Sequence, residues 1–183
     1  CDLHVSCHAQ SGTQVRTGVA FSMLHSGEFM LFGKAVIVGC LKNSAEYLPR
    51  VFQNLEKLAS QYNEVAFIFI ENDSIDATKA MISAWGEKQR NFKLFSLDGL
   101  DGYENNRTLR LEIARNAYIN AIQQDHSLHS YDHMVVMDMD DRGAYPLDSD
   151  ALSSALRFLN EKEERAAVFS NQLVKYYDLW ALR

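Results

Sequence analysis

Three carboxylates close an apolar stretch in the second half of the chain. The stretch MVVMDMDD, residues 134–141, is typical of a buried strand until it reaches Asp138, Asp140 and Asp141. Side chains alternate along a strand, so Asp138 and Asp140 are expected to face one side and the intervening methionine the other. Two oxygen ligands at an open strand end suit a hard cation such as Mg²⁺ or Mn²⁺. Two explanations stay open: a metal site that includes Asp138 and Asp140, and an ordinary solvated acidic turn.

Three arginines precede these carboxylates. Arg107, Arg110 and Arg115 lie within nine residues of an otherwise acidic chain. Intrahelical ion pairs, for example with Glu112, are one explanation. The other is a polyanionic ligand such as a diphosphate, which arginine and a metal ion would hold together.

A second polar cluster follows the apolar run EVAFIFI, residues 64–70. Glu71 and Asp73 stand at its end. A carboxylate at this place could accept hydrogen bonds from a nucleobase edge or from ribose hydroxyls. Alternatively, Asp73 or Ser74 caps the helix that follows.

Apolar periodicity predicts the elements that must position these residues. Strands are expected at 34–40, 64–70, 92–97, 133–139 and 166–171, with helices between them. In the helix at 107–124, the expected buried row is Leu109, Ile113, Ala117 and Ala121. In the helix that follows ENDSIDAT, the residues expected to face inward are Ala77, Met81, Ile82 and Trp85. Strict alternation predicts an α/β, Rossmann-like, mainly parallel sheet with helices on both faces. Ligands bind beyond the carboxyl ends of such strands, so both acidic clusters are expected on one rim.

Composition excludes several classes of protein. The formal net charge of -6 and the pI near 5.5 argue against a nucleic-acid partner. No apolar run approaches the roughly 20 residues of a transmembrane helix. Three cysteines are too few for a disulfide framework, which favours a reducing compartment, in the cytoplasm or at a membrane periphery. His126, His129 and His133 are expected to be solvated.

The chain divides into two parts. Residues 1–33 are an N-terminal extension of unknown role, and residues 34–183 form the α/β domain. The chain starts at Cys1 and stops at LWALR, so we expect a fragment whose domain is incomplete at its C-terminus.

Four motifs in order resemble a known family. KNSAEYLPRV, ENDSIDAT, ARN and DMDD are similar to the corresponding strand ends and helix of GT-A-fold glycosyltransferases of the family-2 type. The similarity extends to the branch with capsule mannosyltransferases and viral glycosyltransferases, where YYDLWALR also has counterparts. The resemblance covers about residues 34–183.

The resemblance implies a metal-dependent hexosyltransferase (EC 2.4) in polysaccharide biosynthesis. The implied donor is a UDP- or GDP-linked sugar, the acceptor a glycan or another hydroxyl, and the cofactor Mn²⁺ or Mg²⁺. Donor-binding residues carried over by the motifs, together with the two further arginines noted above, are Gly39, Lys42, Asn43, Glu71, Asp73, Arg107, Arg110, Arg115 and Asp138. Asp138 and Asp140 would hold the metal, and Asp178 is the candidate catalytic base.

This chain departs from the family pattern at two positions. Glu71-Asn72 replaces the usual pair of aspartates, which leaves the base preference open, and Lys42 stands where many relatives have an uncharged residue. Two other functions stay open as well. One is a non-catalytic module of GT-A fold that binds a nucleotide sugar or glycan. The other is a nucleotidyltransferase, which is disfavoured because GCLKNS lacks the glycines and the arginine of such a loop.

Overall fold

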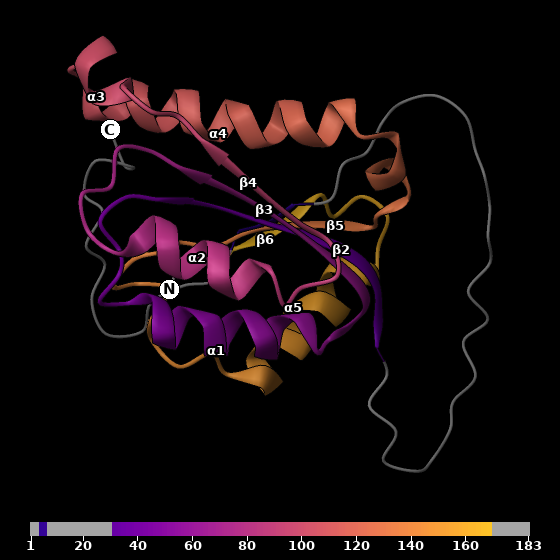
Figure 1. Ribbon diagram of the computed structural model, residues 1–183. Coiled ribbons are helices and arrows are strands. Elements are labelled where there is room, and N and C mark those ends of the chain that lie inside the picture. The colour runs from indigo at the N-terminus through magenta and orange to yellow at the C-terminus, as the bar shows by residue number, and fades with distance from the viewer. Residues whose placement is uncertain (1–3, 7–30, 170–183) are drawn as a thin grey trace.

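A computed structural model describes residues 4–6 and 31–169, which form one sheet with helices packed on both faces (Figure 1). The strands are β1 (His4–Ser6), β2 (Phe32–Leu41), β3 (Tyr62–Glu71), β4 (Phe92–Ser96), β5 (His133–Val136) and β6 (Ala167–Phe169). The helices are α1 (Leu48–Ala59), α2 (Thr78–Gly86), α3 (Leu100–Tyr103), α4 (Arg107–Gln124), α5 (Ser149–Asn160) and the 3₁₀ helix η1 (His126–Ser130).

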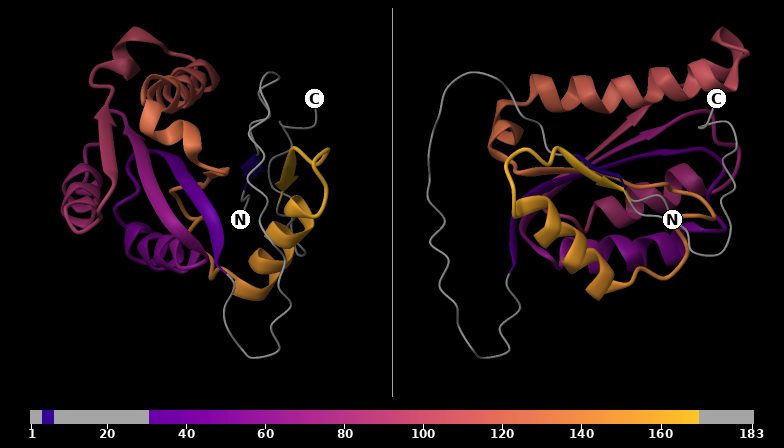
Figure 2. Two further views of the ribbon diagram at one scale, coloured as in Figure 1. Left: turned by 90° about the vertical axis from the view of Figure 1, so that its right-hand side faces the viewer. Right: turned by 180° about the vertical axis from the view of Figure 1, so that it is seen from behind.

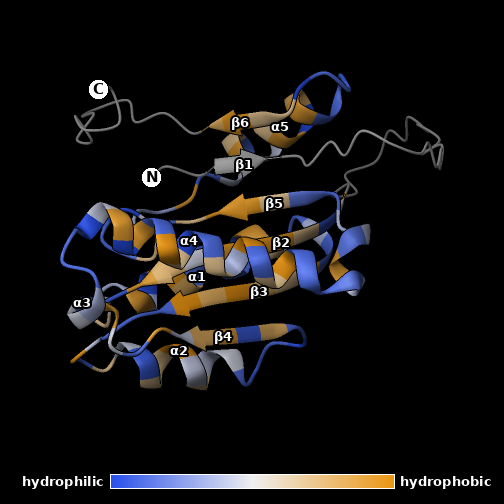
Figure 3. Ribbon diagram, turned by 90° about the horizontal axis from the view of Figure 1, so that it is seen from above, coloured by the Kyte–Doolittle hydropathy of each residue, from blue (hydrophilic) through white to orange (hydrophobic). Residues whose placement is uncertain are grey.

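The strand order in the sheet is β4-β3-β2-β5-β1-β6 (Figure 3). Strands β4, β3, β2 and β5 are mutually parallel, whereas β1 runs antiparallel to both of its neighbours. The expected mainly parallel α/β fold is therefore confirmed. Residues 4–6 of the N-terminal extension contribute a strand to this sheet, a contribution that the sequence analysis did not foresee.

Two apolar clusters occupy the two faces of the sheet. Helices α1, α2 and α5 cover one face, and α4 with η1 covers the other (Figure 2). On the first face, the ring of Trp85 stacks on Phe52 with 5.0 Å between centroids and meets Phe67 edge-on. These large side chains fill the space between α1, α2 and β3.

Helix α4 has the expected bounds but buries another row of side chains. Leu109 is 42% exposed, whereas Ala114 and Tyr118 are buried against β2 and β3. Ile113 and Ala117 are only half-buried. Apolar residues occur on nearly every side of this helix, so periodicity alone did not define its inner face.

Two further expectations about burial were wrong. His133, expected in solvent, is 4% exposed on β5, and its Nε2 lies 3.0 Å from Oδ1 of Asn160. Ala77, expected to face the core, is exposed. Its neighbour Thr78 is buried instead and accepts the backbone N–H of Ser44 at 2.7 Å. Each of these buried polar side chains has a hydrogen-bond partner, although Nδ1 of His133 has none among the described residues.

The order of the strands reverses beside β2. The chain leaves β2 through α1 toward β3 and β4, then returns across the opposite face in α4 to place β5 on the other side of β2. The gap between the carboxyl ends of β2 and β5 is therefore a topological switch point. Ligands of open α/β sheets bind at such points.

Candidate donor-binding cleft

A cleft of about 590 Å³ lies at this switch point, beneath the first half of α4. Ligand pockets in proteins commonly have volumes of roughly 300–1,000 Å³. The end of β2, the end of β5 and one side of α4 form its walls. Its charged lining residues are Lys42, Arg107, Arg110, Arg115, Asp138 and Asp140. Residues from three segments that are far apart in the chain therefore meet in one place.

Gly39 lets β5 approach the floor of this cleft. A Cβ atom at Gly39 would lie 2.6 Å from Cγ of Met139 and 2.8 Å from the carbonyl oxygen of Met137. Both distances are well below an ordinary van der Waals contact. A residue with a side chain would push the end of β5, and the carboxylates after it, away from β2.

The carboxylates of the D-x-D stretch line the cleft, and the methionines pack in the core. Met137 and Met139 are buried in the cluster beneath α1, whereas Asp138 is half-buried and Asp140 is exposed. The strand itself ends at Val136, three residues earlier than expected. The alternation nevertheless continues, because the backbone N–H of Met137 still donates to Val38 at 2.9 Å.

The loop after the D-x-D stretch is held by one buried amide. Asn54 of α1 is 3% exposed and donates to the carbonyl oxygens of Gly143 at 2.7 Å and Tyr145 at 2.5 Å. Its Oδ1 accepts the N–H of Leu147 at 3.0 Å. A Cβ at Gly143 would lie 1.7 Å from the carbonyl oxygen of Asp138. Close packing and three hydrogen bonds thus set the course of residues 138–147.

The three arginines of α4 all line the cleft, but they differ in their partners. The side chain of Arg110 is engaged by neighbouring residues, whereas the side chains of Arg107 and Arg115 make no hydrogen bond or ion pair with any other described residue. Glu112 forms no ion pair with any arginine in that same part of the chain. The intrahelical explanation for these cations is therefore not supported, and two guanidinium groups are available to a ligand.

Cys40 and Tyr118 line the cleft together with Arg115 and Asp138, whose charges act on both groups. Burial raises the pKa of the Cys40 thiol to about 12; the charge of Arg115 opposes that shift and Asp138 adds to it. Burial likewise raises the pKa of Tyr118 to about 12. Both groups are neutral at physiological pH, and the thiol does not have the thiolate character of a catalytic cysteine.

The residues expected around the nucleoside divide into two groups. Gly39 and Lys42 line the cleft, but Asn43, Glu71 and Asp73 do not. Asn43 instead joins two loops: its N–H donates to Oγ of Ser74 at 3.0 Å, and its Oδ1 accepts the N–H of Ile75 at 2.9 Å.

Glu71 is 1% exposed and accepts the N–H of Ser74 at 2.8 Å, with Lys79 3.9 Å away. Asp73 has a positive φ of 47°, and its two carboxylate oxygens accept the N–H groups of Gly99 and Asp101 at 2.6 and 2.7 Å. These backbone hydrogen bonds hold the pKa of Asp73 below its ordinary value. The carboxylates of Glu71 and Asp73 therefore already accept hydrogen bonds from backbone N–H groups at this edge of the sheet.

Asn72 is a lining residue that the sequence analysis did not select. It is 9% exposed, and its side-chain amide makes no hydrogen bond with the described residues. The available signal was its position between Glu71 and Asp73 at a strand end. An amide offers both a donor and an acceptor, as the edge of a nucleobase requires.

The carboxylate oxygens in the cleft suit a metal ion that is held jointly by the protein and by a bound phosphate ligand. Among residues 4–6 and 31–169, no three His, Cys, Asp or Glu side chains are grouped to hold a metal ion by themselves. Mg²⁺ is usually bound by one or two carboxylates together with substrate phosphates. Asp138 and Asp140 fit this arrangement. Asp178, the expected base, lies outside the described residues.

A second hollow, about 510 Å³, lies between β4 and α4, away from the switch point. Its two opposite charges, Lys93 and Asp125, pair with each other at 2.5 Å. Lys93 and Ser127 hold the pKa of Asp125 at about 2. This hollow therefore presents no uncompensated charge to an anion.

One of three comparisons with known proteins gives a match. A family model described as "Glycosyl transferase family 2" matches residues 36–170, well over half of the 183 residues. No curated protein and no solved structure gives a significant match. Within the part of the chain that the structure describes, no helix combines the length and the apolar character needed to cross a membrane.

Proposed function

Since the chain belongs to glycosyl transferase family 2, we propose that the cleft at the ends of β2 and β5 binds a nucleotide-diphosphate sugar with the help of Mn²⁺ or Mg²⁺. The family uses a nucleotide-sugar donor and an acceptor. The metal, the donor sugar and the acceptor are our proposal, as is the narrower resemblance to hexosyltransferases of the capsule mannosyltransferase and viral branch, acting in polysaccharide biosynthesis.

One observation carries the proposal: two carboxylates and two unpaired arginines line the same cleft. Arg107 and Arg115 have the charge and the planar donors that phosphate groups require. Asp138 and Asp140 supply the oxygen ligands. A diphosphate bound together with a divalent cation would satisfy both sides of the cleft, because the arginines would bind the phosphates and the carboxylates would hold the cation.

The residues present would assist the chemistry in defined ways. Sugar transfer passes through an oxocarbenium-like state while negative charge grows on the leaving diphosphate. Arg107 and Arg115 would stabilise that charge within a partly enclosed site, where such interactions are stronger than in water. A bound divalent cation acts as a Lewis acid on the phosphate oxygens.

The proposal includes further donor contacts. Asn72 would offer its amide to a base edge or ribose, and Lys42 also lines the cleft. In an inverting enzyme a carboxylate would deprotonate the acceptor hydroxyl, and Asp178 is our candidate for that role.

Calorimetry on the full chain tests the proposal. UDP, GDP and their sugar derivatives would be titrated first with Mn²⁺ and then with EDTA. We expect one nucleotide to bind tightly and to lose affinity in EDTA. Binding of neither nucleotide under both conditions would contradict the proposal. Release of free sugar or its transfer to a glycan separates an enzyme from the alternative, a binding module without turnover.

A further inference from the structure

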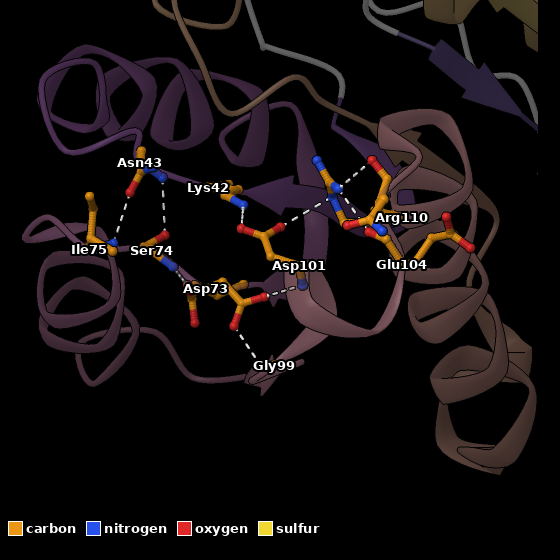
Figure 4. Close-up of polar contacts among 11 residues, drawn as sticks. Lys42, Asn43, Asp73, Ser74, Ile75, Gly99, Asp101, Glu104 and Arg110 are labelled. Carbon is orange, nitrogen blue, oxygen red and sulfur yellow. Dashed lines mark hydrogen bonds and ion pairs between the residues drawn. The ribbon is translucent and has the colours of Figure 1, made fainter.

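Asp73 anchors the start of α3 to the end of β3. Its two carboxylate oxygens accept the backbone N–H groups of Gly99 and Asp101 (Figure 4). Gly99 has a φ of 85°, a conformation that glycine adopts without strain. Leu100 between them is buried. The backbone of Asp101 is therefore held in a defined place beside the cleft.

The side chain of Asp101 reaches two cations of the cleft wall. Its Oδ2 accepts a hydrogen bond from Nζ of Lys42, and its Oδ1 lies 3.1 Å from Nε of Arg110 (Figure 4). Lys42 and Arg110 line the cleft, but Asp101 does not. The carboxylate thus stands behind the two cations and joins the end of β2 to the first turn of α4.

Arg110 is fixed by further contacts. Its NH1 group donates to the carbonyl oxygens of Glu104 at 2.8 Å and Asn105 at 3.0 Å. Its side chain is only 21% exposed, and that of Lys42 is 32% exposed. Both cations are therefore ordered before any ligand arrives. Arg107 and Arg115, in contrast, have no such partner among the described residues.

We propose that Asp101 is a positioning residue for the donor: it holds Lys42 and Arg110 as a preformed anion-binding wall for the diphosphate. The inference rests on the proposed function. Long cationic side chains lose rotamer freedom when they bind an anion, and ordering them beforehand removes that cost. The opposing effect is repulsion between Asp101 and the diphosphate. It is the smaller one, because this half-exposed carboxylate is already compensated by two cations and is screened by solvent.

The first test replaces Asp101 by asparagine in the full chain, which keeps the size of the side chain and removes its charge. The probes are inorganic pyrophosphate, UDP and GDP in Mn²⁺. We expect D101N to weaken the binding of pyrophosphate and of the preferred nucleotide by roughly three- to tenfold. Asp98→Asn is the matched control, because Asp98 belongs to the same loop but pairs with Lys79 outside the cleft. It should bind as wild type does.

A double-mutant cycle separates positioning from a general loss of structure. If Asp101 acts through Lys42, the loss caused by D101N should shrink markedly when Lys42 is already methionine. Equal losses in both backgrounds would overturn the inference, as would unchanged or tighter binding by D101N. Thermal unfolding of each variant checks the fold, and the cycle remains informative if all variants with D101N are equally destabilised. If wild type binds none of the probes, the proposed function itself fails; if wild type binds and D101N matches it, only this inference fails.

Discussion

The side-chain amide of Asn54 donates a hydrogen bond to the carbonyl oxygen of Gly143 at 2.7 Å and so ties helix α1 to the loop that carries Asp140. The two residues are 89 positions apart. The same amide also serves Tyr145 and Leu147. A single buried side chain thus shapes one side of the candidate site without lining it.

Asn54→Ala should destabilise the protein. The substitution removes three hydrogen bonds, to the carbonyl oxygens of Gly143 and Tyr145 and from the N–H of Leu147. A buried group that is left without its partner, as the Gly143 carbonyl would be, costs roughly 1–3 kcal/mol. We expect the free energy of unfolding to fall by about 2–4 kcal/mol in urea titrations. Asn63→Ala is the control, because its exposed amide makes one hydrogen bond, to Phe32. Equal losses in the two variants would contradict the role of Asn54.

Gly143→Ala should displace the D-x-D carboxylates. The new Cβ would lie 1.7 Å from the carbonyl oxygen of Asp138, so the backbone must move. We expect a lower melting temperature and at least about tenfold weaker Mn²⁺-assisted nucleotide binding, since small misplacements of a site are costly. Gly102→Ala is the control, because its Cβ would meet nothing within 4 Å. A variant at Gly143 that binds normally would show that the loop can relax.

Asp140→Asn should remove the metal-dependent part of donor affinity. Asparagine retains an acceptor for the N–H of Arg142, now 2.9 Å from Oδ1 of Asp140, but it is a much poorer ligand for a hard cation. In EDTA, wild type and the variant should bind the nucleotide equally well. Asp141→Asn is the control, because Asp141 does not line the cleft. A persistent Mn²⁺ effect in D140N would refute the metal assignment.

Arg115→Gln should weaken the binding of a nucleoside diphosphate more than the binding of the monophosphate. Arginine–phosphate contacts are charge-assisted, so we expect roughly tenfold weaker binding of the nucleoside diphosphate and a smaller effect on the monophosphate. Arg157→Gln, on α5 outside the cleft, should change neither affinity. Calorimetry with both nucleotides measures the two losses of affinity, which can then be compared. Equal losses for the mono- and diphosphate would place Arg115 elsewhere on the ligand.

Asp73→Asn should reduce the sensitivity of folding to acid. Backbone hydrogen bonds lower the pKa of Asp73 in the folded state, so its contribution to stability is present above its ordinary value of about 3.9 and is lost as the pH falls through the lower folded value. Wild type should therefore lose more stability than D73N between about pH 6 and about pH 3. Urea midpoints across this range measure the difference. Parallel curves would show that the carboxylate is unimportant for folding.

The sequence by itself determined the class of fold and the position of the D-x-D pair. Continuous apolar runs specified the parallel strands because both faces of such a sheet are buried. Period-2 alternation after the fourth of these runs separated Met137 and Met139 from Asp138 and Asp140. Both are local properties, since they depend on neighbouring residues alone. The start of α4 is also determined locally, because the side chain of Asn106 caps the helix by accepting the N–H of Thr108.

Only the tertiary structure decided which polar groups are available. In the sequence, Glu71, Asp73, Arg110 and Arg115 are equivalent candidates for a ligand. The folded chain gives the first three internal partners, and it leaves Arg115 and Asn72 with open hydrogen-bonding capacity toward the cleft. Asp101 gained its place behind Lys42 and Arg110 in the same way. The pairs Asp73–Gly99 and Lys42–Asp101 join residues that are 26 and 59 positions apart, so neither periodicity nor spacing can reveal them.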